Sequence, residues 1–300
     1  MSAFARPAAV AAGAASGASA GAGGTAGSMP ADAYARAKAE GVRFFRRRSL
    51  SLVLVLVLVI AVNALSGTYV GFDFASSLLE VPAGIAWMAT NFIPSAESFE
   101  ELGRILGSLG QTILVSVSAS CTAAVLAFAF AVIGSRSVGL GGPVPVIVRA
   151  IASVFRNIPV VAWAFVLLFS FKQSEFTGFF ALFLGSFGYL TRCYLESIDE
   201  VSAGSVEALR STGAGYLQIV TQAVIPMSIT SVLSWVLYMI ETNIRDATLV
   251  GILTGTGIGF VFDLYYKTFR YDTAGLVILA IVVAVIACEA ISNYVRRQII

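Results

Sequence analysis

The sequence predicts an all-α protein that crosses a membrane about six times. Of its 300 residues, 58% are hydrophobic and only 12% are charged, whereas soluble domains carry about 25% charged residues. The mean hydropathy is correspondingly high, at +0.87. The apolar residues gather in runs long enough to cross a hydrocarbon core of about 30 Å as helices, and polar or glycine-rich segments separate these runs.

The composition also argues against several classes of protein. The chain has no His, and its three cysteines, Cys121, Cys193 and Cys288, lie far apart in the sequence. The usual zinc clusters, a Ser-His-Asp triad and a disulfide framework therefore lack their residues. We expect no catalytic residue, no metal site, no cofactor and no nucleic-acid partner, and an integral-membrane enzyme is disfavoured.

Residues 1–48 are expected to form a cytoplasmic tail. Residues 1–31 are rich in Ala, Gly and Ser and lack the ordered basic, apolar and small-residue regions of a cleaved signal peptide. This composition predicts a disordered extension. Six basic residues then precede an apolar run at residues 50–65: Arg36, Lys38, Arg43, Arg46, Arg47 and Arg48. By the positive-inside rule, this cluster places the N-terminus in the cytoplasm.

Residues 49–104 predict a first span followed by an external segment. No charge occurs between Ser49 and Phe72, which is long enough to cross the bilayer. Only acidic residues then follow before Arg104, namely Asp73, Glu80, Glu97, Glu100 and Glu101. An external segment is expected to lack basic residues in this way, and it has room for short amphipathic helices.

Five further spans are expected between residues 105 and 295. They cover residues 105–135, 146–171, 176–191, 225–240 and 273–290. The third span of the chain contains Pro159 and has Arg149 and Arg156 near its start, so we expect its first turns to be broken. Residues 241–272 are expected to connect the last two spans outside the cell. With six spans, the C-terminus, with Arg296 and Arg297, is cytoplasmic as well.

A polar, helix-prone segment, residues 206–226, lies between the fourth and fifth spans. A first helix is expected around Glu207, to end at Gly213 or Gly215, because Gly tolerates positive φ. A second helix should follow from Tyr216, and Pro226 suits the first turn of the next span because Pro lacks an N–H donor. The pattern predicts a helix-turn-helix along the membrane surface. An ordinary amphipathic interfacial loop is the alternative.

These residues carry a resemblance to a known family. The pattern consists of Glu207-Ala208-Leu209, then Gly213, then Ile225-Pro226, and it resembles the cytoplasmic "EAA" signature of permease subunits of ABC importers. Leu209 stands where that family has a second Ala. The resemblance implies that residues 196–224 form the coupling loop, whose first helix docks on an ATP-hydrolysing subunit and transmits its closure to the spans.

Two further stretches resemble the phosphonate importer permeases, and the likeness covers roughly residues 105–295. One runs from Glu241 through Asn243, Arg245 and Thr248 to the glycines at positions 251, 255, 257 and 259. The other is Arg156-Asn-Ile158-Pro159-Val-Val-Ala-Trp163-Ala164. Val160 stands where the family usually has Glu, and Thr256-Gly257 where it has consecutive glycines.

The resemblance implies an all-α, MetI-like permease core in a bacterial inner membrane, importing phosphonate or a related oxyanion such as phosphite or phosphate. It implies four kinds of partner: a cytoplasmic ABC ATPase dimer, an extracytoplasmic phosphonate-type binding protein, a second copy of the chain, and membrane lipid. No Gly-Lys-Ser or Gly-Lys-Thr occurs in the sequence, so the chain has no Walker loop of its own. The ATPase must be a separate subunit.

Candidate pathway residues are taken from the two stretches that carry this resemblance, and the physics of charges and glycines in a membrane agrees with most of them. They are Arg156, Glu241, Asn243, Arg245, Thr248, Gly255, Gly257 and Gly259. Intramembrane charges usually face a cavity or a partner. Arg245 would give an anion path positive potential, and Glu241 would orient it. Alternatively, the two residues simply pair as i, i+4 neighbours on a helix. Arg156 serves the path or anchors a lipid headgroup. The glycines form a hinge near the path or pack helices closely.

Two other interpretations stay open, one within the ABC permeases and one in a different class of transporter. A permease for methionine or another small solute is possible because the cytoplasmic signature does not identify the cargo. A secondary transporter driven by an ion gradient would need no ATPase and would usually show an internal repeat, which the sequence does not display.

Overall fold

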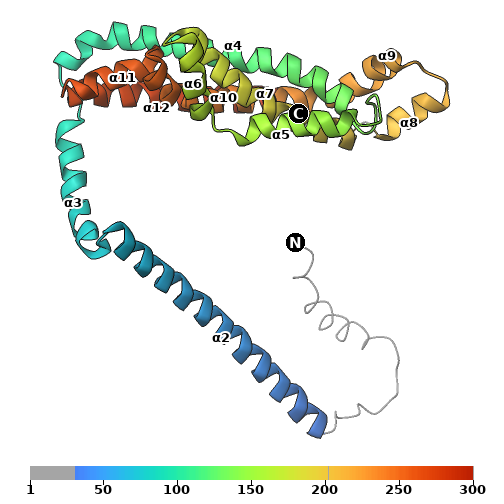
Figure 1. Ribbon diagram of the computed structural model, residues 1–300, viewed down its shortest axis with the longest axis horizontal. Coiled ribbons are helices and arrows are strands. Elements are labelled where there is room, and N and C mark those ends of the chain that lie inside the picture. Colours follow the sequence, from blue (N-terminus) through green and yellow to red (C-terminus); the bar gives the residue numbers. More distant parts are fainter. Residues whose placement is uncertain (1–30, 202, 300) are drawn as a thin grey trace. The chain divides into compact units, whose positions relative to one another are not determined.

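The computed structural model describes residues 31–201 and 203–299, as helices joined by short turns (Figure 1). The disordered extension expected at residues 1–30 lies outside the described residues. By contacts the chain divides into two units, Met1–Val81 and Pro82–Ile300. The division falls inside the segment 49–104 that the sequence groups together.

The described part of the first unit, residues 31–81, comprises the long helix α2 (Ala31–Val70) and the beginning of α3 (Phe74–Asn91). The part of α2 that is long and apolar enough to cross a membrane is Ser49–Val70. Its Leu and Val side chains are exposed all round the helix. A helix that is hydrophobic on every side suits a lipid environment, in agreement with the predicted first span.

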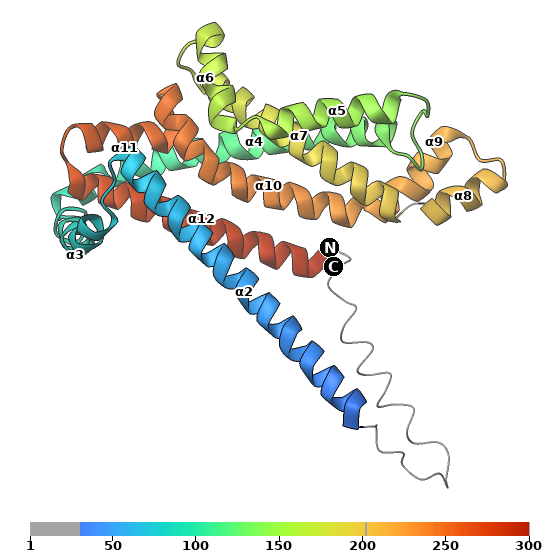
Figure 2. The same cartoon turned by 60° about the horizontal axis from the view of Figure 1, so that its bottom comes forward.

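The second unit holds the rest of the helices. After α3 come η1 (Glu97–Glu101), α4 (Leu102–Gly134), α5 (Val144–Asn157), α6 (Val160–Phe171), α7 (Glu175–Val201), α8 (Ala203–Ser211), α9 (Tyr216–Ile219), the π-helical turn η2 (Val220–Val224), α10 (Ile225–Thr254), α11 (Gly257–Lys267) and α12 (Tyr271–Ile299). Within this unit α8 and α9 lie at one end of the bundle and α11 at the other (Figures 1 and 2). We call these the α8 end and the α11 end.

The centre of the second unit is α7, which packs against α4, α5, α6 and α10. Its closest neighbour, α4, presents Ala119, Ala123, Ala127 and Ala131, all fully buried. Their spacing of four residues places them on one face of the helix. Small residues let membrane helices approach closely, where dispersion contacts hold them together.

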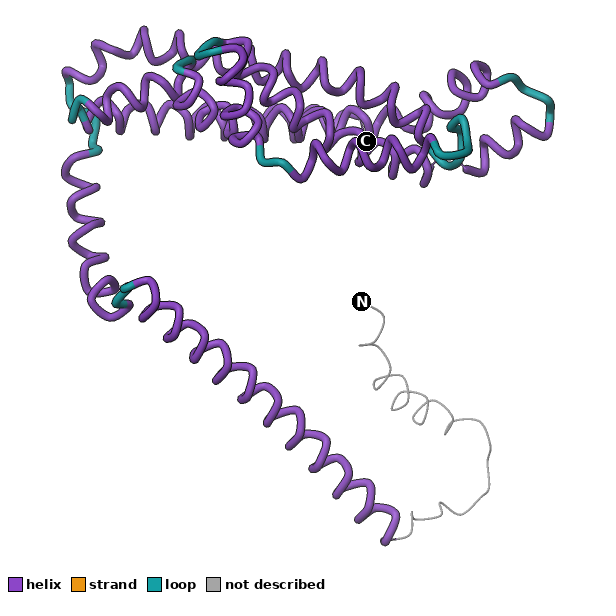
Figure 3. Tube along the Cα trace, viewed as in Figure 1, coloured by secondary structure: helices purple, strands orange, loops and turns teal. Residues whose placement is uncertain are grey.

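The all-α, polytopic fold class is confirmed. None of the described residues is in a strand (Figure 3). Four helices qualify as spans by length and composition, in Ser49–Val70, Glu97–Gly134, Tyr216–Thr254 and Tyr271–Gln298, and a fifth qualifies if α5 and α6 count as one bent span. The remaining predicted span, residues 176–191, is the first part of α7, which does not meet the same test. Charged residues such as Arg192 and Glu196 occupy its later turns.

The predicted break at Pro159 is present, because α5 and α6 bend by 89° at this point. Ile158 is extended, with φ −91° and ψ 120°, as the residue before a proline prefers. The break lies directly on α7, since a Cβ atom added to Gly188 would come within 2.5 Å of the Arg156 backbone nitrogen. A glycine in α7 therefore makes room for the bend.

The predicted end of the fifth span at residue 240 is wrong. Helix α10 continues through Glu241 and Arg245 to Thr254, because the two charges pair within the helix and need no loop. The predicted interruption among the glycines is confirmed, since α10 ends at Gly255, which has a φ of +68°. Gly251 and Gly259 instead lie within helices at a point of close packing: a Cβ atom on Gly251 would be 3.3 Å from the Gly259 Cα atom.

Candidate functional site

The α8 end carries the predicted helix-turn-helix, residues 203–219. Helix α8 stops because Gly213 has a φ of +81°, a conformation that Gly adopts without steric cost. The Leu209 carbonyl accepts the N–H groups of Thr212 at 3.2 Å and Ala214 at 3.1 Å. At the start of α9, the Gly215 N–H donates to the Gln218 side chain at 2.8 Å. The turn is therefore closed by hydrogen bonds on both sides.

The two faces of α8 differ. Val206 is only 2% exposed, and Leu209 packs with it against the core cluster that α4, α7 and α10 share. Glu207 and Ala208 are exposed, and Leu217 of α9 exposes 75% of its surface. Leu209 thus belongs to the packed side of the helix, while Glu207 and Ala208 form its free face.

The junction between α9 and α10 is a π-helical turn. The Ile225 N–H donates to the Val220 carbonyl, five residues back, and Pro226 has no N–H to continue the ordinary pattern. Both residues are exposed at the base of α10. Such turns within helices are frequent at functional positions. The Ile-Pro pair of the sequence motif therefore marks the point at which the π-helical turn passes into α10.

Asn243 is fully buried and ties three helices together. Its Nδ2 atom donates to the Ser120 hydroxyl of α4 at 2.8 Å and to the Ser186 hydroxyl of α7 at 2.7 Å. Its backbone carbonyl accepts the Ser116 hydroxyl at 3.2 Å. These contacts give Asn243 a structural position between helices, not one on an open surface.

The charged pair lies elsewhere on α10. Arg245 donates to Glu241 at 3.1 Å; half of the Arg245 side chain is exposed but only 13% of the Glu241 side chain. An α-helix rotates by about 100° per residue, so the Arg245 side chain leaves α10 about 200° around the helix axis from the Asn243 side chain. Asp246, which the sequence interpretation missed, is half-buried beside it. The signal was available, because an intramembrane carboxylate is itself unusual.

The other candidates are spread over the unit. Arg156 is exposed in the last turn of α5 and has no ion pair among the described residues. The Thr248 hydroxyl donates to the Ile244 carbonyl of its own helix, at 3.4 Å. Gly255 lies against Gln173, and Gly259 against the Thr248 backbone. The structure thus brings together Glu241 with Arg245, but it does not gather all candidates around one opening.

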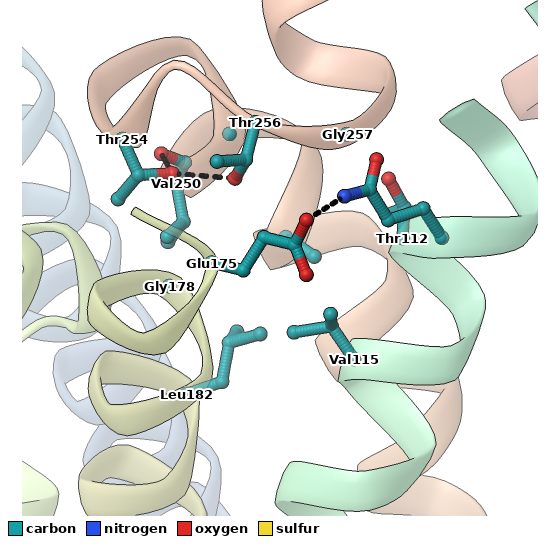
Figure 4. Close-up of a pocket in the computed structure, with 12 residues that line it drawn as sticks. Thr112, Val115, Glu175, Gly178, Leu182, Val250, Thr254, Thr256 and Gly257 are labelled. Carbon is teal, nitrogen blue, oxygen red and sulfur yellow. Dashed lines mark hydrogen bonds between the residues drawn. The ribbon is translucent and has the colours of Figure 1, made fainter. Parts of the chain in front are cut away.

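A cavity at the α11 end has room for very little. Its lining comes from α4, α7, α10 and α11, as Figure 4 shows: Gln111, Thr112, Val115, Glu175, Gly178, Leu182, Ala247, Val250, Gly251, Thr254, Thr256 and Gly257. The Gln111 amide donates to Glu175, and the Thr112 hydroxyl accepts the Ile258 N–H at 2.9 Å. The volume is about 20 Å³, enough for about one water molecule. The helices are closed together here.

The sequence was compared with protein families and with individual proteins. The family model described as binding-protein-dependent transport system inner membrane component matches residues 123–299. The phosphate-import permease protein PhnE of Mycolicibacterium smegmatis is 28% identical over 254 residues, 80% of this chain and 47% of that protein. The phosphite transport system permease protein PtxC of Stutzerimonas stutzeri is 25% identical over 230 residues, 77% of this chain and 83% of that protein. The chain thus spans about half the length of the first relative.

The fold is also found among solved structures. An inward-facing conformation of the MetNI methionine ABC transporter superposes with a TM-score of 0.60 at 17% identity, covering 69% of this chain and 99% of that one. This likeness concerns the fold alone. The family model covers more than half of the chain and includes the helix-turn-helix with Glu207 and the base of α10. The chain therefore belongs to the family of binding-protein-dependent transport system inner membrane components.

Proposed function

We propose that the chain is the permease subunit of an ATP-driven importer whose cargo is phosphonate or a related oxyanion, phosphite or phosphate. The observation that carries the proposal is the two-faced helix α8. Its packed side, with Val206 and Leu209, is part of the core cluster, and its free side presents Glu207 and Ala208. A helix built in this way can receive force from a partner and pass it to the spans.

The route of the force follows from packing. Val206 of α8 and Ile219 of α9 belong to the same buried cluster as Tyr194 of α7 and Val232 of α10. Close-packed interiors are difficult to compress, so displacement of α8 and α9 moves the attached ends of α7 and α10. ATP-driven closure of a cytoplasmic ATPase dimer would thereby alternate the access of the pathway.

The cargo is inferred from the relatives and from charge. The names of both relatives refer to phosphorus oxyanions, phosphate for PhnE and phosphite for PtxC. Arg245 supplies an exposed guanidinium on a spanning helix, and such a group attracts anions while its partner Glu241 holds it in place. Most of the selection would fall to an external solute-binding protein, since a permease site must release its cargo readily.

One copy would supply half of the pathway. Two copies, related by a two-fold axis, would enclose the translocation path and present two α8 helices to two ATPase subunits. The protein would then lie in the bacterial inner membrane with both termini in the cytoplasm, as the basic residues before the first span and near the C-terminus favour.

Reconstitution tests this function. The chain, its ATPase and its binding protein are placed in liposomes, and uptake of radiolabelled methylphosphonate, phosphite, phosphate and methionine is measured with and without enclosed ATP. We expect uptake of at least one phosphorus oxyanion that requires ATP and the binding protein. Uptake driven by an ion gradient without the ATPase, or uptake of methionine alone, would refute the proposal.

A further inference from the structure

A polar cluster lies at the α8 end, next to α8 itself, and is centred on Asp199 in the last turns of α7. Its Oδ1 atom accepts the Ser135 hydroxyl at 2.6 Å, the Arg136 N–H at 2.8 Å and the Ser137 hydroxyl at 3.1 Å. Its Oδ2 atom accepts from Arg149 of α5 at 2.7 Å. One carboxylate thus joins α7, α5 and the turn after α4.

The turn that Asp199 holds is itself built around Ser135. The Ser135 hydroxyl accepts the N–H groups of Ser137 at 3.1 Å and Val138 at 3.3 Å. Ser135 and Val138 are each 1% exposed, and Val138 lies in the same core cluster as Val206 of α8. The turn is therefore fixed both by apolar packing and by the charge of Asp199.

Burial distinguishes this cluster from an ordinary surface ion pair. The Arg149 and Asp199 side chains are only 17% and 21% exposed. Burial alone would raise the pKa of the Asp199 carboxyl, but the donors from Ser135, Ser137 and Arg136 outweigh it and hold the pKa below its ordinary value. Charge-assisted hydrogen bonds of this kind are roughly twice as strong as neutral ones, so the cluster is a firm connection.

The cluster adjoins the coupling helix directly. A groove of about 550 Å³ is lined by Arg136, Ser137 and Asp199 on one side and by Val206, Glu207 and Arg210 of α8 on the other. Asp199 belongs to α7 and lines this groove together with residues of α8. It therefore lies between α8 and the parts of α4 and α5 that it contacts.

We infer that Asp199 is a positioning residue for coupling: it clamps the turn at residues 135–138 and the start of α5 to α7, so that a displacement of α8 carries α4 and α5 along with α7. The inference rests on the proposed function, in which α8 receives the force of the ATPase. Without the clamp, α8 would still bind the ATPase, but α4 and α5 would follow its movement less closely.

The test compares Asp199→Asn with Asp263→Asn. Asp263 is the matched control because it lies on α11, outside residues 196–224, pairs with Lys267 at 2.7 Å and is 22% exposed, much like Asp199. ATP hydrolysis and substrate uptake are measured in the same proteoliposomes, together with the amount of ATPase that co-purifies. We expect Asp199→Asn to keep the co-purified ATPase and its hydrolysis, and to lower the uptake per ATP hydrolysed about tenfold, within the usual range of coupling free energies. Asp263→Asn should leave this ratio unchanged.

A second pair of variants, at Arg149, distinguishes loss of the clamp from misfolding of the protein. Arg149→Lys keeps an ion pair, whereas Arg149→Met removes it and leaves the hydrogen bonds from the turn in place. We expect Arg149→Met to lower the uptake per ATP and Arg149→Lys to restore most of it, which a merely structural role would not require.

Three outcomes would overturn the inference. A normal uptake per ATP in Asp199→Asn and Arg149→Met would show that the clamp does not transmit movement. Loss of the co-purified ATPase in Asp199→Asn would place Asp199 in the docking surface instead. If the unmodified chain neither binds an ATPase nor transports, the proposed function itself fails, and the inference fails with it.

Discussion

The openings at the two ends of the second unit differ in size and in the bonding of the polar residues that line them. At the α11 end, Gln111, Glu175 and Thr112 bond to neighbouring helices around a cavity of about 20 Å³. At the α8 end, Glu207 and Arg210 line an open groove of about 550 Å³. Polar groups join helices at both ends, since Asp199 does so at the α8 end, but Glu207 and Arg210 in the same groove are exposed. In the proposed function, these exposed groups make the α8 end the part of the molecule to which the ATPase binds.

Breaking the turn at Gly213 should have the largest effect. Gly213→Pro forces φ from +81° to about −65° and would redirect α9, so the free face of α8 loses its position. We expect ATPase co-purification and uptake to fall about a hundredfold, in line with a disruption of about 3 kcal/mol. Gly213→Asn is the control, since Asn tolerates positive φ. Normal uptake in Gly213→Pro would show that the turn does not hold the coupling helix in place.

The next effect concerns the close packing near the α11 end. A methyl group at Gly259 would collide with the Thr248 backbone, whereas one at Gly107 of α4 would meet no atom within 4 Å. We expect Gly259→Ala to lower the free energy of unfolding by about 2 kcal/mol, as overpacking does, and Gly107→Ala to leave it nearly unchanged. Denaturation of the detergent-solubilised protein measures both. Equal stability of the two variants would mean that the helices at this end are not tightly packed.

Arg245 tests whether the pathway uses the exposed face of α10. We expect Arg245→Ala to lower anion uptake about tenfold, which corresponds to about 1.4 kcal/mol, while stimulation of ATP hydrolysis by the loaded binding protein falls less. Lys267→Ala is the charge-matched control, because Lys267 is 71% exposed at the α11 end and pairs with Asp263 of its own helix. If uptake by Arg245→Ala is unchanged, Arg245 does not line the path.

The smallest effect is expected at Asn243. Ser120, one of the two hydroxyls that the amide contacts, already donates to the Ser116 carbonyl of its own helix at 2.8 Å, so removal of the amide leaves this hydroxyl partly satisfied. The bond from the Ser116 hydroxyl to the Asn243 backbone carbonyl does not depend on the side chain. We expect Asn243→Ala to lower the free energy of unfolding by about 1 kcal/mol and to change uptake only in proportion to folded protein. Thr242→Ala is the neighbouring control. A loss of uptake at normal stability would instead place Asn243 in the pathway.

The sequence predicted the α8 end well because its signals are local. Gly213 and Gly215 favour the end of one helix and the start of the next, and Pro226 favours the first turn of a helix. These preferences do not depend on contacts with distant residues. The basic residues and the apolar runs likewise predicted the membrane fold class without any knowledge of packing.

The rest depends on contacts between distant residues. No local pattern shows that Asn243 meets Ser120 and Ser186, and none shows that Asp199 reaches back to residues 135–137. The predicted end of the fifth span at residue 240 was wrong for a related reason: Glu241 and Arg245 look like loop residues singly, but together they neutralise each other on one helix.

The central claim is that the free face of α8 binds a cytoplasmic ATPase. Photo-crosslinking from Ala208, which is exposed on that face, tests it most directly, with Tyr294 of α12, 67% exposed, as the control position. We predict a crosslink from Ala208 to an ATPase subunit that disappears with Gly213→Pro, and none from Tyr294 to that subunit. Crosslinking of Ala208 to lipid alone, or its labelling only from outside the cell, would contradict the account.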